Sequence, residues 1–268
     1  MGIEGTGIER TGTSVSATEG LRVFWMPGCS SCVKVKEFLK KLDVPFDSVN
    51  VLTDPKAESD LHEMGAMGFP VVSRGKDFVC AQSLDDVSKF LGRDIKFERL
   101  APRELMNRWF YFSDIAREMV DKIPQEHLQA LPIPNRNRTL HGLSYHIFQV
   151  PEAFLENAEN GEEHFDKYFD APPPDDVKTS ADVRAYGDRI TSRLRHYWHN
   201  LPDDSFGWTV KTFYGVQPSH HFLERSVWHM AQHIRQLQVV LDSYNVSLAR
   251  RVDEQQYKGL PMPDGVWE

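Results

Sequence analysis

In the first third of the chain, short apolar runs alternate with longer segments in which apolar residues are spaced among polar ones. The short runs predict a strand that ends near residue 25 and further strands at 44–51, 68–72 and 76–80. The longer segments predict helices over residues 33–42, 55–64 and 84–91, the last capped by Ser83 and closed by Gly92. The predicted order is therefore strand, helix, strand, helix, strand, strand, helix.

Beyond residue 102 the apolar positions repeat with the period of a helix. Helices are expected over residues 103–123, 139–157, 180–200 and 219–244, and a short hairpin over 208–216. The acidic, proline-containing segment 159–176 is expected to be a loop. Four helices of this length, joined by loops, predict an all-α four-helix bundle.

Length and composition fit a two-domain globular protein, because the first set of elements accounts for only about a third of the 268 residues. We expect a disordered tail at 1–20, a first domain at 21–93, a linker at 94–103 and a helical domain with a C-terminal tail at 104–268. A net charge of -8 gives no reason to expect a nucleic-acid partner, and no apolar run approaches membrane-spanning length. The first residues lack the apolar core of a signal peptide, and three cysteines favour a reducing cytoplasm.

A Cys-x-x-Cys pair, Cys29 and Cys32, lies where the first strand ends and the first helix begins. A helix N-terminus favours the thiolate, so Cys29 is the candidate nucleophile, and Cys32 can resolve a mixed disulfide on it. Half of a zinc site and an inert pair are the alternatives. A closed zinc site needs four ligands, and the other cysteine, Cys80, stands alone in an apolar run.

The order of elements and the loop Pro27–Cys32 resemble the glutaredoxins and the glutaredoxin-like NrdH redoxins, which have an α/β thioredoxin fold. The segment Phe69-Pro70-Val71 resembles the cis-proline turn of this family. The resemblance implies thiol-disulfide exchange at the two cysteines and a thiol-binding groove shaped by Pro70 and Val71. Pro70 could instead be an ordinary proline at the start of a strand.

Two departures from the family bear on its partners. Ser30-Ser31 stands between the cysteines, and Ala81-Gln82-Ser83 replaces the glycine-containing turn that helps glutaredoxins to hold glutathione. The bound thiol can therefore be glutathione or another low-molecular-weight thiol. The reductant can be a partner similar to thioredoxin reductase.

Three histidines fall on apolar helix faces. His146 lies within the predicted core stripe of the second long helix, and His229 and His233 lie one turn apart on the inner side of the fourth. His141 falls toward the other face and is expected at the surface. A shared divalent metal would satisfy three buried imidazoles and keep open positions for catalysis, whereas the alternative is simple hydrogen bonding of the rings. Glu152 and Glu156 could orient a ligand ring, although exposed carboxylates are the default interpretation.

The helical part, residues 104–250, resembles the DinB-like four-helix bundles, which include metal-dependent thiol transferases. The resemblance rests on Leu143-Ser144-Tyr145-His146 and on His229 and His233 followed by Arg235-Gln236. It implies that His146, His229 and His233 hold a divalent metal, with zinc as the first choice and nickel or iron as alternatives. It also implies that the protein can form a homodimer.

Together these patterns predict a glutaredoxin-like oxidoreductase fused to a metal-binding bundle that acts on or transfers a low-molecular-weight thiol. Its substrates would be small-molecule thiols and disulfides or protein disulfides. Two other hypotheses stay open, which are a redoxin with a non-catalytic dimerisation or docking bundle, and a sensor of redox state or metal.

Overall fold

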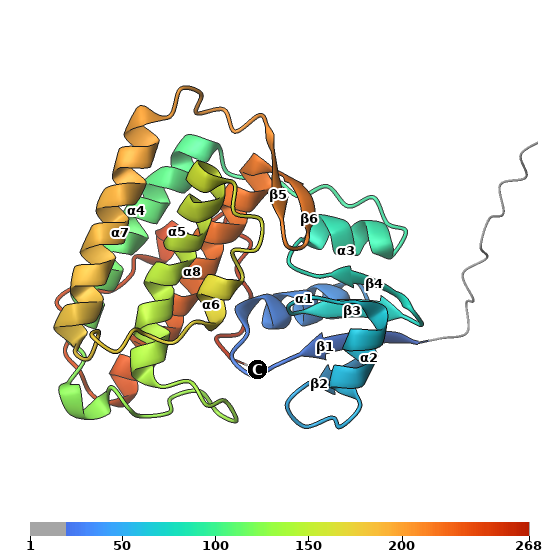
Figure 1. Ribbon diagram of the computed structural model, residues 1–268, viewed down its shortest axis with the longest axis horizontal. Coiled ribbons are helices and arrows are strands. Elements are labelled where there is room, and N and C mark those ends of the chain that lie inside the picture. The colour runs from blue at the N-terminus through green and yellow to red at the C-terminus, as the bar shows by residue number, and fades with distance from the viewer. Residues whose placement is uncertain (1–19, 268) are drawn as a thin grey trace, which may run out of the picture.

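The computed structural model describes residues 20–267, so the tail predicted at 1–20 lies outside the described residues except for Gly20. Figure 1 shows a small sheet with short helices beside a group of long helices. No helix within residues 20–267 combines the length and the apolar character that crossing a bilayer requires.

The N-terminal part of the chain, from β1 to α3, has a thioredoxin-like fold built on a four-stranded sheet with the strand order β2-β1-β3-β4. β1 runs parallel to β2 and antiparallel to β3, and β3 forms a hairpin with β4. The elements are β1 (Leu21–Trp25), α1 (Ser30–Lys41), β2 (Asp47–Asn50), α2 (Ala57–Met64), β3 (Val71–Arg74), β4 (Asp77–Cys80) and α3 (Leu84–Phe90). The observed order is the predicted one.

Alternation along β1 sends side chains to both faces of this sheet. Val23 packs in one apolar cluster with Val35 of α1 and Val87 of α3. Phe24, the next residue, packs in a second cluster with Leu61 of α2. The sheet is therefore covered on both faces.

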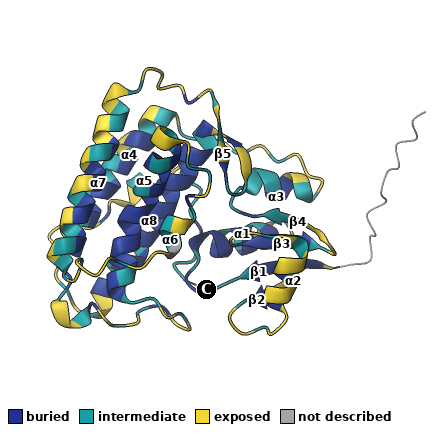
Figure 2. Cartoon of the chain, in the orientation of Figure 1, coloured by how far each residue is buried: buried dark blue, intermediate teal, exposed yellow. Residues whose placement is uncertain are grey.

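The helical part of the chain, from α4 onward, is a four-helix bundle, as predicted. α8 packs against both α4 and α5, and α7 packs against the same two helices. The long helices are α4 (Pro102–Val120), α5 (Leu140–Asn160), α7 (Ser180–Asn200) and α8 (Ser219–Ser243), and the shorter elements are η1 (Gln125–His127), α6 (Lys167–Asp170), β5 (Thr209–Thr212), β6 (Gly215–Pro218) and η2 (Glu254–Tyr257). Figure 2 shows that α8 is buried along most of its length.

Two expectations about the helical half were wrong. The segment 159–176, predicted to be a loop, contains α6, which packs against α5. His141 was expected at the surface, yet only 8% of it is exposed. The chain before α5 folds back over the start of this helix, where the His141 N–H donates to the Leu128 carbonyl (2.8 Å). The periodicity of apolar residues along a helix gives no information about a segment from elsewhere in the chain that covers the helix.

The two halves are joined by polar contacts at several places. Gln217 in β6 donates to Asp86 in α3 (2.8 Å), and Arg99 forms an ion pair with Glu224 in α8 (3.1 Å). The backbone N–H groups of Asp264 and Gly265 both donate to Glu37 in α1. The C-terminal segment therefore connects the first helix of one half to the last long helix of the other. The predicted domain boundaries stay a prediction.

Candidate redox and metal site

The two cysteines differ in their access to solvent. Cys29 is the N-cap residue of α1, where its sulfur accepts a hydrogen bond from the Cys32 N–H (3.2 Å), and the two residues form a disulfide. Cys29 is partly exposed, whereas Cys32 is completely buried. Cys29 is therefore the more accessible of the two cysteines, and a position at a helix N-terminus favours a thiolate.

Gly28 lets the cysteine loop lie against the helical half. Its φ angle is +70°, and a Cβ there would be 2.8 Å from Cγ2 of Ile133. The neighbouring Pro27 carbonyl accepts a hydrogen bond from Arg136 (3.0 Å). A side chain at position 28 would therefore strain the backbone and collide with the other half of the protein.

The Phe69–Pro70 peptide bond is cis, as the resemblance to the redoxins implied. The Pro70 carbonyl accepts a hydrogen bond from the Ala81 N–H (2.7 Å), and Val71 is buried in the sheet. Gly68 and Phe69, rather than Pro70 and Val71, line the cavity beside Cys29. The substrate-binding role of Pro70 and Val71 stays a prediction.

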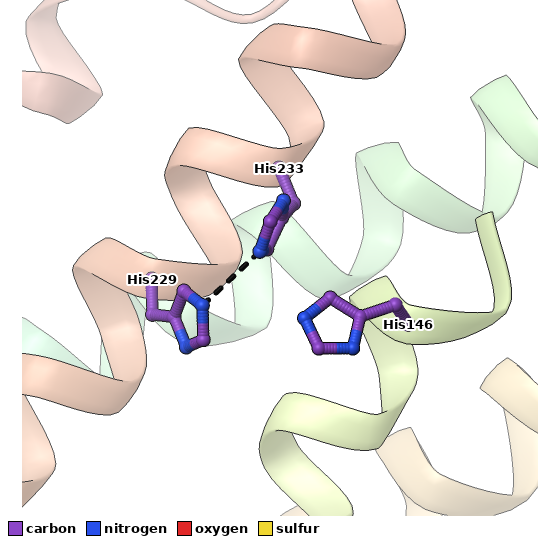
Figure 3. Close-up of side chains that lie close together, drawn as sticks. All are labelled: His146, His229 and His233. Atoms are coloured by element: carbon purple, nitrogen blue, oxygen red, sulfur yellow. Dashed lines mark hydrogen bonds between the residues drawn. The ribbon is translucent and has the colours of Figure 1, made fainter. Parts of the chain in front are cut away.

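The structure brings His146 of α5 together with His229 and His233 of α8, as Figure 3 shows. All three residues are buried, and one ring nitrogen from each lies within 4.8 Å of the others. The Nε2 atoms of His229 and His233 are 3.1 Å apart. Two nitrogens bound to one tetrahedral zinc ion at about 2.0–2.1 Å would be separated by roughly 3.3 Å, so the spacing fits a shared ion.

Two glutamines set the tautomers of two of these rings. Nδ1 of His146 lies 3.2 Å from Oε1 of Gln149, and Nδ1 of His233 lies 2.7 Å from Oε1 of Gln236. Each glutamine uses its amide nitrogen to donate to a backbone carbonyl, that of Ala171 or Val266, so its oxygen must face the imidazole. Both Nδ1 atoms therefore carry the proton, and both Nε2 atoms present a lone pair, that of His233 toward Nε2 of His229.

Burial and nearby guanidinium groups keep the three rings neutral. Burial lowers the pKa of His146 and His229 well below the usual value of 6.5, and lowers the pKa of His233 to about 3. Arg138 adds to the effect at His146 and His233, and Arg225 adds to it at His229. The neutral imidazole is the form that binds metals. Nδ1 of His229 is buried without a hydrogen-bond partner among the described residues.

One cavity of about 270 Å³ joins the cysteine loop to the three histidines. Its walls come from both halves of the chain. Those from the N-terminal half are Met26, Gly28, Cys29, Ser30, Ser31, Gly68, Phe69 and Gln82, and those from the helical half are Arg136, Arg138, His146, Asp166, Phe169, Phe213, Arg225, His229 and His233. The lining among the described residues includes three guanidinium groups and one carboxylate, so it favours an anionic ligand.

Sequence reasoning missed Gln149 as a partner of the histidines and considered Glu152 and Glu156 instead. Glu156 accepts a hydrogen bond from Arg193 (2.7 Å). Glu152 accepts a hydrogen bond from the Tyr186 hydroxyl and has no role at the rings in the structure. The sequence does carry a signal for the glutamines, because a Gln follows both His146 and His233 at a spacing of three residues. No local pattern pointed to Arg225.

The Glutaredoxin family model matches residues 21–79, which contain β1 to β3 and most of β4. Among solved structures, the chain is similar to a DinB-like protein from Bacillus cereus ATCC 10987. That similarity has a TM-score of 0.46 and 16% sequence identity, and covers 55% of this chain and 95% of the other. No curated protein matches the sequence.

Proposed function

We propose that this protein is a glutaredoxin-like thiol-disulfide oxidoreductase whose helical half binds a divalent metal ion and acts on the same low-molecular-weight thiol. The observation that carries the proposal is the shared cavity, which is lined by Cys29 and by all three converging histidines. A thiol in this cavity has access to both groups. The alternation between thiol and disulfide suits a reducing cytoplasm.

The redox step belongs to the two cysteines. The Cys29 thiolate attacks one sulfur of a disulfide RS–SR, a thiolate leaves, and RS remains bonded to Cys29. The Cys32 thiolate then attacks Cys29, so that RS⁻ departs and the Cys29–Cys32 disulfide forms. A dithiol reductant, such as a partner similar to thioredoxin reductase, must supply two electrons to restore the pair.

The residues that would hold the metal are His146, His229 and His233, and Gln149 and Gln236 keep two of the rings aimed at it. A divalent ion held there would act as a Lewis acid that lowers the pKa of a coordinated thiol and prepares it for transfer to an electrophile. Zinc is the first choice, and nickel or iron would suit the same three nitrogens.

Metal content tests the metal half of the proposal. We expect nearly one equivalent of metal in anaerobically purified wild type and in His199→Ala, which removes an exposed histidine. We expect its loss from His233→Ala, measured by inductively coupled plasma mass spectrometry. If wild type takes up no metal even after reconstitution with zinc, nickel and iron, this half of the proposal fails.

The cysteine variants test the redox half. Cys29→Ser should abolish disulfide reduction, whereas Cys32→Ser should accumulate a mixed disulfide on Cys29 that intact-mass spectrometry detects. A Cys29→Ser protein that still reduces disulfides would refute the assignment of the nucleophile.

A further inference from the structure

Arg225 is a buried cation that lines the same cavity as Cys29, and the proposed chemistry does not use it. It lies in α8, one turn before His229, and only 5% of it is exposed. Its guanidinium group lines the cavity that contains Cys29. Among the side chains that the structure describes, no carboxylate forms an ion pair with it, and its hydrogen bonds go to the neutral side chain of Gln82 (2.8 and 3.2 Å).

A buried guanidinium group without an anion is unusual, because removing the charge from water is costly unless an opposite charge compensates. Burial lowers the pKa of Arg225, which reflects this cost. The rings of Phe169 and Tyr214 lie near the guanidinium carbon (5.3 and 5.8 Å) and compensate part of the charge. The remaining charge faces the cavity.

Gln82 holds Arg225 against the redox loop. Its Oε1 accepts hydrogen bonds from Arg225 and from the Ser31 hydroxyl (2.9 Å), and Ser31 lies between the two cysteines. Its amide nitrogen donates to the Phe69 carbonyl, directly before the cis-proline. Gln82 belongs to the segment where glutaredoxins carry the turn that helps to hold glutathione, so here this segment recruits a cation from the helical half.

We propose that Arg225 binds a carboxylate of the thiol substrate, so that the helical half supplies the anion-binding part of a site whose sulfur chemistry takes place at Cys29. Two of the five guanidinium N–H groups donate to Gln82, which leaves donors for a carboxylate. Arg136 and Arg138 line the same cavity and add positive charge, and Asp166 opposes it. The inference rests on the redox half of the proposed function and names its substrate class.

Three small disulfides of similar length test the inference on the wild-type chain without any substitution. They are 3,3′-dithiodipropionate, which is anionic, bis(2-hydroxyethyl) disulfide, which is neutral, and cystamine, which is cationic. Each reacts with the reduced full-length protein to give two thiols and the Cys29–Cys32 disulfide, and tryptophan fluorescence in stopped flow follows the reaction. We expect the rate constant to be highest for the anionic disulfide and lowest for the cationic one.

The variant Arg225→Met should lower the ratio of the anionic to the neutral rate constant at least tenfold, which corresponds to the loss of a charge-assisted hydrogen bond. Arg225→Lys should give an intermediate ratio, because it keeps the charge without the planar fork. Arg93→Met removes an exposed positive charge and should keep the wild-type ratio. If Arg225→Met does not fold, Arg225→Lys decides, because an unchanged ratio in that variant would overturn the inference.

The possible failures can be separated. If the neutral disulfide reacts and the wild type shows no preference for the anionic one, the inference about Arg225 is overturned while the redox proposal stands. If none of the three disulfides reacts, the proposed function itself fails. A preference that survives Arg225→Met and disappears in His233→Ala would assign the carboxylate to the metal site and overturn the inference.

Discussion

Replacing Gln236 by leucine should weaken metal binding although Gln236 is not itself a proposed ligand. Its Oε1 lies 2.7 Å from Nδ1 of His233, and its amide nitrogen donates to the Val266 carbonyl (3.0 Å). Leucine has a similar size and removes both contacts. The proton of His233 is then free to move to Nε2, the atom that would otherwise bind the metal.

The expected loss of metal affinity follows from the Nδ1–H of His233, which Gln236→Leu leaves without an acceptor. A buried Nδ1–H without an acceptor costs about 1–3 kcal/mol, and loss of such an outer partner typically weakens metal affinity by about 10- to 100-fold. This range corresponds to about 1.4–2.7 kcal/mol of binding free energy. We therefore expect the dissociation constant for zinc to rise by about 10- to 100-fold in Gln236→Leu.

The matched control is Gln232→Leu. Gln232 is also buried in α8 and also donates to the Val266 carbonyl (3.1 Å), but its side chain makes no hydrogen bond to a histidine. Both variants disturb the C-terminal segment, and only one disturbs the imidazole. Competition with a chromophoric zinc chelator measures both affinities. Equal weakening in the two variants would show that the C-terminal segment, and not the hydrogen bond to His233, determines the affinity.

Three further predictions concern reactivity and stability. Burial raises the pKa of the Cys80 thiol to about 12. Iodoacetamide at pH 8 should therefore alkylate Cys29 of the reduced protein and spare Cys80, as peptide mass spectrometry will show. Equal labelling of the two cysteines would contradict this prediction. Gly28 and Gly161 both have positive φ angles, and only at Gly28 would an added Cβ meet another side chain. Gly28→Ala should therefore lower the free energy of unfolding in urea by about 1–3 kcal/mol more than Gly161→Ala. Equal losses in the two variants would refute the collision. Burial lowers the pKa of His141 in the folded state. As the pH falls below about 6.5, this histidine is therefore protonated in the unfolded state before it is protonated in the folded state, and the free energy of unfolding decreases. His141→Asn should therefore lose less unfolding free energy between pH 7 and pH 5 than wild type, and an unchanged dependence would refute this assignment.

Local signals explain why most elements could be predicted. The helix expected at residues 180–200 coincides with α7 because Thr179 and Asp182 form a capping box at its start. The sequence pattern likewise ends a strand and begins a helix on either side of the cysteine loop, so the place of this loop in the fold could be predicted. These signals act within one or two turns of the chain, so a single sequence contains them.

The two wrong predictions, for His141 and for the segment 159–176, concern features that depend on contacts distant along the chain. His141 lies on a helix face that periodicity assigns to solvent, yet a segment from outside the helix covers it. α6 is one turn long, and Phe169 within it packs near His146 and His229. Such short elements depend on tertiary packing more than on their own propensity.

The sequence by itself determined the cysteine pair at a helix start and the inward faces of His146, His229 and His233, because strand alternation and helical period are properties of neighbouring residues. Only the tertiary structure decided that these two sets of residues share one cavity. The meeting of Arg225 with Gln82 joins residues 143 positions apart. That contact depends on how α8 packs against the segment that follows β4, which no local pattern along the chain encodes.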